Sequence, residues 1–342
     1  MSTPNIAAGT IRSRRGRRRR RRRQRRLPIL LFLLILFCLI GTAAVFLLSG
    51  LKKSYSIAKR YPQFMNSADL PLMTEDLAVI DPQEEYDTSV TSSEAGIVLN
   101  TTDKTVVYSK NPYERLYPAS LTKVMTALLV LENGGLDETV EVTKDAVITE
   151  NGASLAGIKP GDKITVRELL YGLMLPSGND AANALAVHTS GSVDAFVAEM
   201  NRKAALLGCA GTHFVNTNGL SDDQHYTTAY DFCLIFQKAF EHPEFREIVS
   251  TRQHVGNWIG SDGAGIAKTW DNSNWYLTKK AASPKTVTVI GGKTGTTRAA
   301  GSCLVMASEN EEGKEFISII LKAENHDTLY QNMTNILGKI KE

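Results

Sequence analysis

The chain has 342 residues, of which 43% are hydrophobic and 22% charged, and its formal net charge is +3. This length is sufficient for one large catalytic domain with additional segments. The four cysteines form no Cys-x-x-Cys pair, the six histidines show no metal-ligand spacing, and no Gly-rich phosphate loop is present. We therefore expect no disulfide framework, no metal site and no bound cofactor.

The small net charge hides a strongly basic N-terminal tail. Twelve of the 39 basic residues are arginines within residues 1–26, which contain no acidic side chain. The remaining chain therefore has 27 basic against 36 acidic residues. An arginine run of this kind could bind nucleic acid or an acidic partner, but the segment that follows favours another role.

A long apolar segment follows the tail directly. Residues 27–48 are almost wholly apolar and uncharged, which is long enough to cross a bilayer. The positive-inside rule then keeps the arginines in the cytoplasm, and no specific nucleic acid is expected. A cleavable signal peptide is the alternative, because Gly41–Ala44 offers small residues, but its apolar core usually spans only about 7–15 residues. The sequence predicts a cytoplasmic tail at 1–26, a single-pass cell-membrane anchor at 27–51, a spacer at 52–93 and an extracytoplasmic domain at 94–342.

The first candidate reactive group is a serine at a predicted helix start. Ser120 and Lys123 are spaced to lie one helical turn apart on one face, and Pro118 precedes an apolar run typical of a helix. Serine needs a base to take its proton, and a lysine with a lowered pKa can be that base. The Ser120 N–H, near a helix N-terminus, is a natural donor to an oxyanion. Taken alone, the motif also fits a capping serine and a solvated lysine.

A turn between two predicted helices supplies further polar groups. Residues 166–175 show a helical apolar pattern, and a helix resumes at 180–185. Ser177 and Asn179 lie in or beside this turn, where packed helices would hold a hydroxyl and an amide rigidly. Ser177 would relay a proton between Lys123 and a leaving group, and Asn179 would hold the lysine and a substrate amide. A plain interhelical loop is the alternative.

The C-terminal third is predicted to contain an antiparallel meander. Residues 286–290 are β-branched, and residues 302–308 and 316–321 form two more apolar runs of strand length.

A third group of candidate residues follows the first of these strands. Lys293 would supply positive charge for a substrate carboxylate, and Thr294 a hydroxyl. Gly295 would let a ligand backbone approach closely, and the Thr296 N–H on an exposed strand edge would be a second oxyanion donor. The alternative is a strand-end lysine in solvent.

Together, the three motifs resemble those of the serine-type D-Ala-D-Ala carboxypeptidases, the low-molecular-weight penicillin-binding proteins of the peptidase S11 family. The likeness runs from about Glu94 to Leu337. It includes Leu116–Ser120, Ser177–Asn183, Gly211–Asn216, His225–Asp231 and Gly292–Thr297.

The resemblance implies an α+β fold of the β-lactamase/DD-peptidase type, with an antiparallel five-stranded sheet flanked by helices and a helical subdomain. The active site would lie between them, with Ser120 as acyl-enzyme nucleophile, Lys123 as proton acceptor, Ser177 as relay and Lys293 as carboxylate anchor. The expected substrates are peptidoglycan stem peptides ending in D-Ala-D-Ala, from which terminal D-Ala is released. β-Lactam antibiotics are the expected covalent inhibitors.

Several different functions are compatible with such a fold. A class A β-lactamase needs a glutamate-held water, but no Glu-x-x-Leu-Asn element follows Ser177, and Gly178 stands where those enzymes commonly have aspartate. A DD-endopeptidase and a non-catalytic penicillin-binding scaffold would carry the same motifs, although their intactness disfavours the scaffold. A zinc peptidase of the same specificity is disfavoured because the histidines lack metal spacing.

The remaining residues of interest are assigned smaller roles. Arg298 is a candidate to assist Lys293 with a terminal carboxylate. The others are expected to be structural: Cys209, Cys233 and Cys303 as small buried residues, His213 and His225 in loops, and Asn272–Trp275 in packing.

Overall fold

The computed structural model describes residues 80 and 86–340. The chain divides into two units, Met1–Pro71 and Leu72–Glu342, and every described residue lies in the second. The predicted tail and anchor, and most of the predicted spacer, lie outside the described residues. No helix among the described residues combines the length and the apolar character needed to span a membrane.

The centre of the fold is a five-stranded sheet in the order β2-β1-β9-β8-β7, in which every neighbouring pair is antiparallel. This confirms the predicted five-stranded antiparallel sheet and the meander of its last three strands. The strands span Ala95–Asn100 (β1), Thr105–Lys110 (β2), Val287–Thr297 (β7), Gly301–Asn310 (β8) and Glu315–Ala323 (β9).

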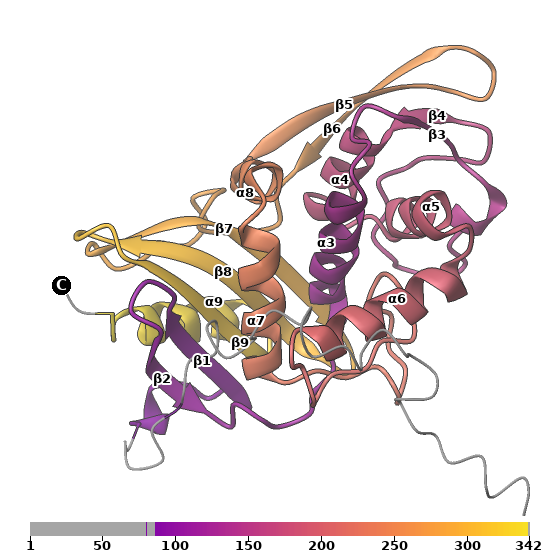
Figure 1. The fold of residues 1–342 in the computed structure, drawn as a ribbon. Helices are drawn as coiled ribbons and strands as arrows, with labels where there is room; N and C mark the ends of the chain where they lie inside the picture. Colours follow the sequence, from indigo (N-terminus) through magenta and orange to yellow (C-terminus); the bar gives the residue numbers. More distant parts are fainter. Residues whose placement is uncertain (1–79, 81–85, 341–342) are drawn as a thin grey trace, which may run out of the picture. The chain divides into compact units, whose positions relative to one another are not determined.

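Both faces of this sheet are covered by helices, as Figure 1 shows for α7 (Ala229–Phe240) and α9 (His326–Leu337). Successive side chains of a strand point to opposite faces. In β8, Leu304 and Met306 pack in the cluster that contains α9, and Val305 and Ala307 pack in the other. Because two apolar faces must be buried, the strands are apolar almost without alternation.

A helical subdomain stands beside the sheet (Figure 1), as predicted. Its central helix α3 is buried at every residue from Lys123 to Leu131. Side-chain caps start four of the described α-helices, with Thr165, Ser192, Thr228 and Asn325 each accepting from a backbone N–H in the first turn. The remaining helices after α3 (Lys123–Asn133) are α4 (Val166–Met174), α5 (Asn179–Ser190), α6 (Val193–Leu206) and α8 (Pro243–Ser250).

A second sheet, which the sequence did not suggest, has four strands in the order β3-β4-β5-β6. Its β5–β6 hairpin extends away from the main sheet at the top of Figure 1. Trp258 and Trp270 stack on one face of the hairpin at 5.9 Å, and Trp270 Nε1 donates to Ala156 O at 3.0 Å. The strands are Thr139–Glu141 (β3), Lys163–Thr165 (β4), Gln253–Ile259 (β5) and Gly265–Asp271 (β6).

Strand β7 is longer than predicted and continues through the third motif to Thr297. Gly291 and Gly292 do not end the strand; they mark an irregular register where neighbouring backbones approach closely. A Cβ at Gly291 would overlap Val249 O, and one at Gly292 would overlap Val305 O. The predicted end of the strand at 290 is therefore wrong, and Lys293 lies inside β7, as does Thr296, which was expected on a strand edge.

The end of the predicted spacer packs onto the folded unit that follows it. Lys110 Nζ donates to Thr91 O at 3.0 Å, and Asn332 Nδ2 of α9 donates to Ser93 Oγ at 2.7 Å. Thr91 and Ser93 are buried. Residues close before β1 thus contribute to the fold.

Candidate active site

Ser120 lies at the start of the central helix, where the sequence predicted a helix start. A 3₁₀ turn, Ala119–Thr122 (η4), leads directly into α3. Ala119 has a φ of +49°, a conformation that costs a non-glycine residue roughly 1–3 kcal/mol. Ser120 is half-buried and Lys123 is fully buried, so the serine is accessible to a ligand and the lysine is shielded from bulk water.

The amine of Lys123 is surrounded by three oxygen atoms. Nζ lies 2.7 Å from Asn179 Oδ1, 2.7 Å from Asn218 O and 3.1 Å from Ser120 Oγ. The first two oxygens can only accept. A neutral amine satisfies both with its two N–H groups and directs its lone pair at the Ser120 hydroxyl, which is the arrangement a general base requires.

Burial favours that neutral form. It lowers the pKa of Lys123 well below its usual value, and the positive charge of Lys293 lowers this pKa further, while Asp180 opposes the shift. Burial also lowers the pKa of Lys293 to about 7. Charged amines lose free energy in a low-dielectric interior, so both lysines release their protons more easily than in water.

The second motif is held rigidly between α4 and α5. Ser177 has a φ of +63°, and a side chain at Gly178 would lie 2.7 Å from both Ala156 N and Gly172 O. The space at Gly178 therefore leaves no room for an aspartate. Ser177 Oγ is buried and makes no hydrogen bond within the described residues, and it is Ser120 that contacts Lys123.

The third motif faces Ser120 from the edge strand β7. A Cβ at Gly295 would lie 2.8 Å from Ser120 N, so glycine is needed for this approach. Lys293 is buried, which overturns the solvent-exposed alternative, and its Nζ donates to Thr294 O at 2.9 Å. The Thr296 side chain is exposed, and its Oγ1 lies 3.4 Å from His326 Nε2.

Sequence reasoning missed three contributors to this site. Asn218 supplies the carbonyl that accepts from Lys123, and Gly219 packs against the Ala119 carbonyl. The turn-forming run Asn216–Gly219 was the available signal. Ser273 Oγ lies 2.6 Å from Thr294 Oγ1, although its segment was expected only to pack.

The structural assignments of the cysteines are confirmed, since all three described cysteines are buried and free. Cys38 lies outside the described residues. Arg298 is exposed just beyond β7, and its assistance to Lys293 stays a prediction. In the described part of the chain, no cluster of three or more His, Cys, Asp or Glu side chains is arranged to hold a metal ion.

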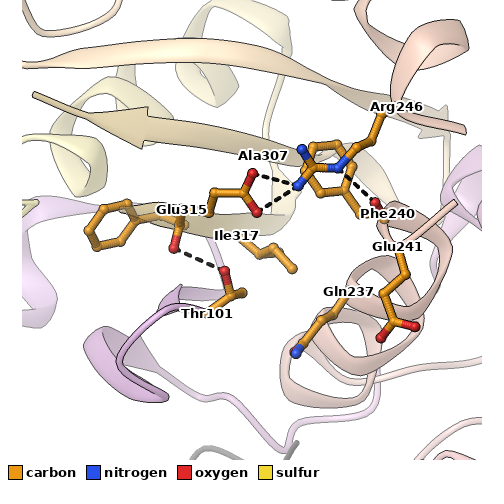
Figure 2. Close-up of a pocket in the computed structure, with 9 residues that line it drawn as sticks. Thr101, Gln237, Phe240, Glu241, Arg246, Ala307, Glu315 and Ile317 are labelled. Atoms are coloured by element: carbon orange, nitrogen blue, oxygen red, sulfur yellow. Dashed lines mark hydrogen bonds and ion pairs between the residues drawn. The ribbon is translucent and has the colours of Figure 1, made fainter. Parts of the chain in front are cut away.

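A cavity of about 390 Å³ lies elsewhere on the molecule, between α7, α8 and the start of β9 (Figure 2). Arg246 Nη2 donates to both carboxylate oxygens of Glu315 at 2.5 and 2.6 Å, and its Nε donates to Phe240 O at 2.9 Å. The guanidinium also lies 4.0 Å from the centre of the Phe240 ring. Nε and Nη2 of Arg246 thus tie α8 to α7 and to β9, and no predicted site residue lines this cavity.

Comparisons with known proteins all point to one protein family. The family model described as D-alanyl-D-alanine carboxypeptidase matches residues 81–325. The chain is 33% identical over 237 residues to D-alanyl-D-alanine carboxypeptidase DacF of Bacillus subtilis, covering 68% of this chain and 58% of that protein. It is 35% identical over 255 residues to the D-alanyl-D-alanine carboxypeptidase of Streptomyces sp. strain K15, covering 71% of this chain and 85% of that one.

Solved structures agree with the sequence comparison. The crystal structure of the Streptomyces K15 DD-transpeptidase matches with a TM-score of 0.68 and 33% identity, over 75% of this chain and 98% of that one. A putative penicillin-binding protein homologue from Mycobacterium tuberculosis matches with a TM-score of 0.63 and 30% identity, over 72% of this chain and 90% of that one. The chain belongs to the peptidase S11 family of D-alanyl-D-alanine carboxypeptidases.

Proposed function

We propose that this protein is a serine D-Ala-D-Ala carboxypeptidase that removes the terminal D-Ala from peptidoglycan pentapeptide stems through an acyl-enzyme on Ser120. The observation that carries this proposal is the environment of Lys123. Its buried amine can donate its two N–H groups to two carbonyl oxygens, and its third contact is the Ser120 hydroxyl. The lysine and the serine therefore form a preformed pair of base and nucleophile.

In the acylation step, Lys123 takes the proton of the Ser120 hydroxyl while Oγ attacks the carbonyl of the penultimate D-Ala. Negative charge then develops on that carbonyl oxygen, where the N–H groups of Ser120 and Thr296 are the proposed donors. The close approach of Gly295 to Ser120 N supports this placement beside β7.

Collapse of the tetrahedral intermediate breaks the peptide bond and releases D-Ala. Its amine needs one proton, which Lys123 returns, with Ser177 as the proposed relay. Asn179 keeps Lys123 aligned through the 2.7 Å hydrogen bond. Lys293 and Thr294, with electrostatic help from Arg298, are proposed to bind the terminal carboxylate. Water then hydrolyses the ester and restores Ser120.

The direct test is release of D-Ala from diacetyl-Lys-D-Ala-D-Ala by the full-length chain in detergent, compared with Ser120→Ala. We expect D-Ala release by the wild-type protein and loss of both release and covalent penicillin labelling in the variant. Ser250→Ala, at an exposed serine that ends α8, should behave as wild type. Labelling that persisted in Ser120→Ala would remove Ser120 from this role.

Transfer to an amine is a second candidate reaction, because the structurally similar Streptomyces K15 protein is named both a carboxypeptidase and a DD-transpeptidase. Both reactions share the acyl-enzyme and differ in the acceptor. Adding glycine as acceptor and measuring the ratio of transfer product to hydrolysis product would separate them. Rapid penicillin hydrolysis without D-Ala release would instead favour a β-lactamase.

We also propose that residues 27–51 anchor the protein in the cell membrane with the catalytic unit outside and the arginines in the cytoplasm. The uncharged apolar run and the charge bias of its flanks support this topology. We expect the full-length chain to remain in membranes after alkaline extraction. A protease added outside intact cells should digest the catalytic unit and leave the arginine tail intact. A soluble, N-terminally shortened product would indicate a cleaved signal peptide.

A further inference from the structure

A chain of three hydrogen bonds runs from Val215 through the buried His225 and Thr122 to Ala119, the residue before Ser120. Val215 N donates to His225 Nδ1 at 3.1 Å, His225 Nε2 lies 2.7 Å from Thr122 Oγ1, and Thr122 Oγ1 donates to Ala119 O at 2.9 Å. His225 and Thr122 are both buried. The two side chains therefore link the loop at residues 215–225 to the η4 turn.

The direction of this chain of hydrogen bonds follows from its two ends. A backbone N–H can only donate, so Nδ1 of His225 is the acceptor and the ring proton of the neutral imidazole is on Nε2. Nε2–H then donates to Thr122 Oγ1, which leaves the single hydroxyl proton of Thr122 for the Ala119 carbonyl. Burial supports the neutral ring, because it lowers the pKa of His225 to about 4.

The Ala119 carbonyl determines the direction of the Ser120 N–H. The peptide unit that joins the two residues is planar and trans, so its C=O and N–H point in opposite directions. Fixing the carbonyl therefore fixes the N–H. This peptide needs support, since Ala119 has a φ of +49°. Gly219 packs against the same carbonyl so closely that a Cβ there would overlap it.

We infer that His225 is a positioning residue for the oxyanion donor: through Thr122 it holds the Ala119–Ser120 peptide so that the Ser120 N–H points at the carbonyl oxygen of the acylated substrate. The inference rests on the proposed function, since it requires acylation of Ser120. His225 takes no proton in the reaction, because its Nε2–H is engaged with Thr122 and its Nδ1 with Val215. The histidine expected only to be structural thus acts on the transition state through two intervening residues.

Two pairs of variants separate this role from simple support of the fold. Thr122→Val keeps the shape but removes the hydroxyl, and Thr122→Ser retains it. His225→Asn places its amide near the Nδ1 position and cannot reach Thr122, whereas His225→Gln can place an N–H near the Nε2 position. His213→Gln, just before this loop and outside this chain of hydrogen bonds, is the matched control.

The measurement is stopped-flow acylation of the full-length chain by benzylpenicillin, which gives the Kd of the noncovalent complex and the first-order acylation rate constant k2. We expect Thr122→Val and His225→Asn to lower k2 by about 10- to 10²-fold, as misaligning an oxyanion donor does, with Kd changed less than about twofold. Thr122→Ser and His225→Gln should recover most of k2, and His213→Gln should retain it. Urea unfolding of each variant gives its folded fraction, which is used to correct the measured acylation.

The second readout is the ester carbonyl stretch of the acyl-enzyme, measured by infrared difference spectroscopy with benzylpenicillin carrying ¹³C at the β-lactam carbonyl. Loss of a hydrogen bond to this carbonyl raises its frequency, so Thr122→Val should shift the band upward, and lost stability alone would not. Wild-type k2 and an unshifted band in Thr122→Val would overturn the inference while leaving the proposed function intact. Labelling that persisted in Ser120→Ala would instead overturn the proposed function.

Discussion

The role proposed for Lys123 as a base depends on its neighbours. Its Nζ has two oxygen acceptors that cannot donate, and the third contact is the hydroxyl of Ser120. Burial and the charge of Lys293 lower its pKa, so the neutral amine that can accept a proton is more populated than it would be for a lysine in water. Lysine in water would be protonated and could not act as a base.

Replacing Lys123 by methionine keeps much of the buried volume and removes the base. We expect acylation by benzylpenicillin to slow by at least roughly 10²–10⁴-fold, the usual contribution of a general base. Lys203→Met, which removes only a partly exposed ion pair with Glu132, should acylate as wild type. A decrease of only tenfold in Lys123→Met would mean that another group takes the serine proton.

The pH profile of acylation tests the coupling between the two lysines. Lys293⁺ disfavours protonation of Lys123, so Lys293→Met should raise the pKa of Lys123. The neutral base then exists only at higher pH, and the acidic limb of a k2–pH profile should move to higher pH. The position of the limb, and not the size of k2, is the readout, because the variant also loses a substrate contact. A limb that stays in place would show that the charge of Lys293 does not contribute to the pKa of Lys123.

At the scale of elements, the site depends on close approaches between backbones that glycine alone permits. Gly295 brings β7 against Ser120, and Gly219 brings the loop after α6 against Ala119. Both contacts meet at η4, whose conformation is strained at Ala119. The η4 turn, which carries Ser120, is thus held between the edge strand β7 and the loop that contains Gly219, which are far apart in sequence.

Gly219→Ala and Gly191→Ala form a matched pair. Both glycines have positive φ, +89° and +78°, but a Cβ at Gly191 has no neighbour within 4 Å while one at Gly219 would overlap Ala119 O. Each variant should lose roughly 1–2 kcal/mol of unfolding free energy for the left-handed conformation, and Gly219→Ala should lose more because of the overlap with Ala119 O. Only Gly219→Ala should also lower k2, by more than about tenfold, because it displaces the Ser120 peptide. Urea unfolding and stopped-flow acylation measure the two effects, and equal k2 values would contradict this account.

At the scale of the whole molecule, burial of neutral groups makes stability depend on pH. The pKa of His225 is lowered by burial to about 4, from about 6.5 in an unfolded chain. Between these two values the unfolded state binds a proton that the folded state does not, so the free energy of unfolding falls as the pH is lowered through this range. Above about pH 6.5 this contribution is constant.

His225→Gln removes that proton uptake. The wild-type protein should lose on the order of 3 kcal/mol more stability than the variant between pH 7 and pH 4. Urea unfolding of both proteins at several pH values in this range measures the difference, in which the other titrating groups cancel. Parallel stability–pH curves for the two proteins would show that His225 is not buried neutral.

Much of the fold could be predicted locally. The helices at 166–175 and 180–185 and the three C-terminal strands were found from apolar periodicity and β-branched residues, because those patterns reflect burial within a single element. Strands β3 and β4 of the second sheet were missed because they have only three residues each, too few to show a period. The length of β7 was missed because Gly291 and Gly292 normally indicate a break.

The sequence by itself determined the three motifs, their order and the family, because these depend only on residue identity and spacing. It also determined the expectation of a basic tail and an apolar anchor, which lie outside the described residues. Only the tertiary structure decided that Lys293 is buried, that the Asn218 carbonyl completes the Lys123 environment, and that His225 reaches Thr122. Each of these is a contact between residues more than 90 positions apart or a property of the packed interior, and no local pattern encodes such contacts.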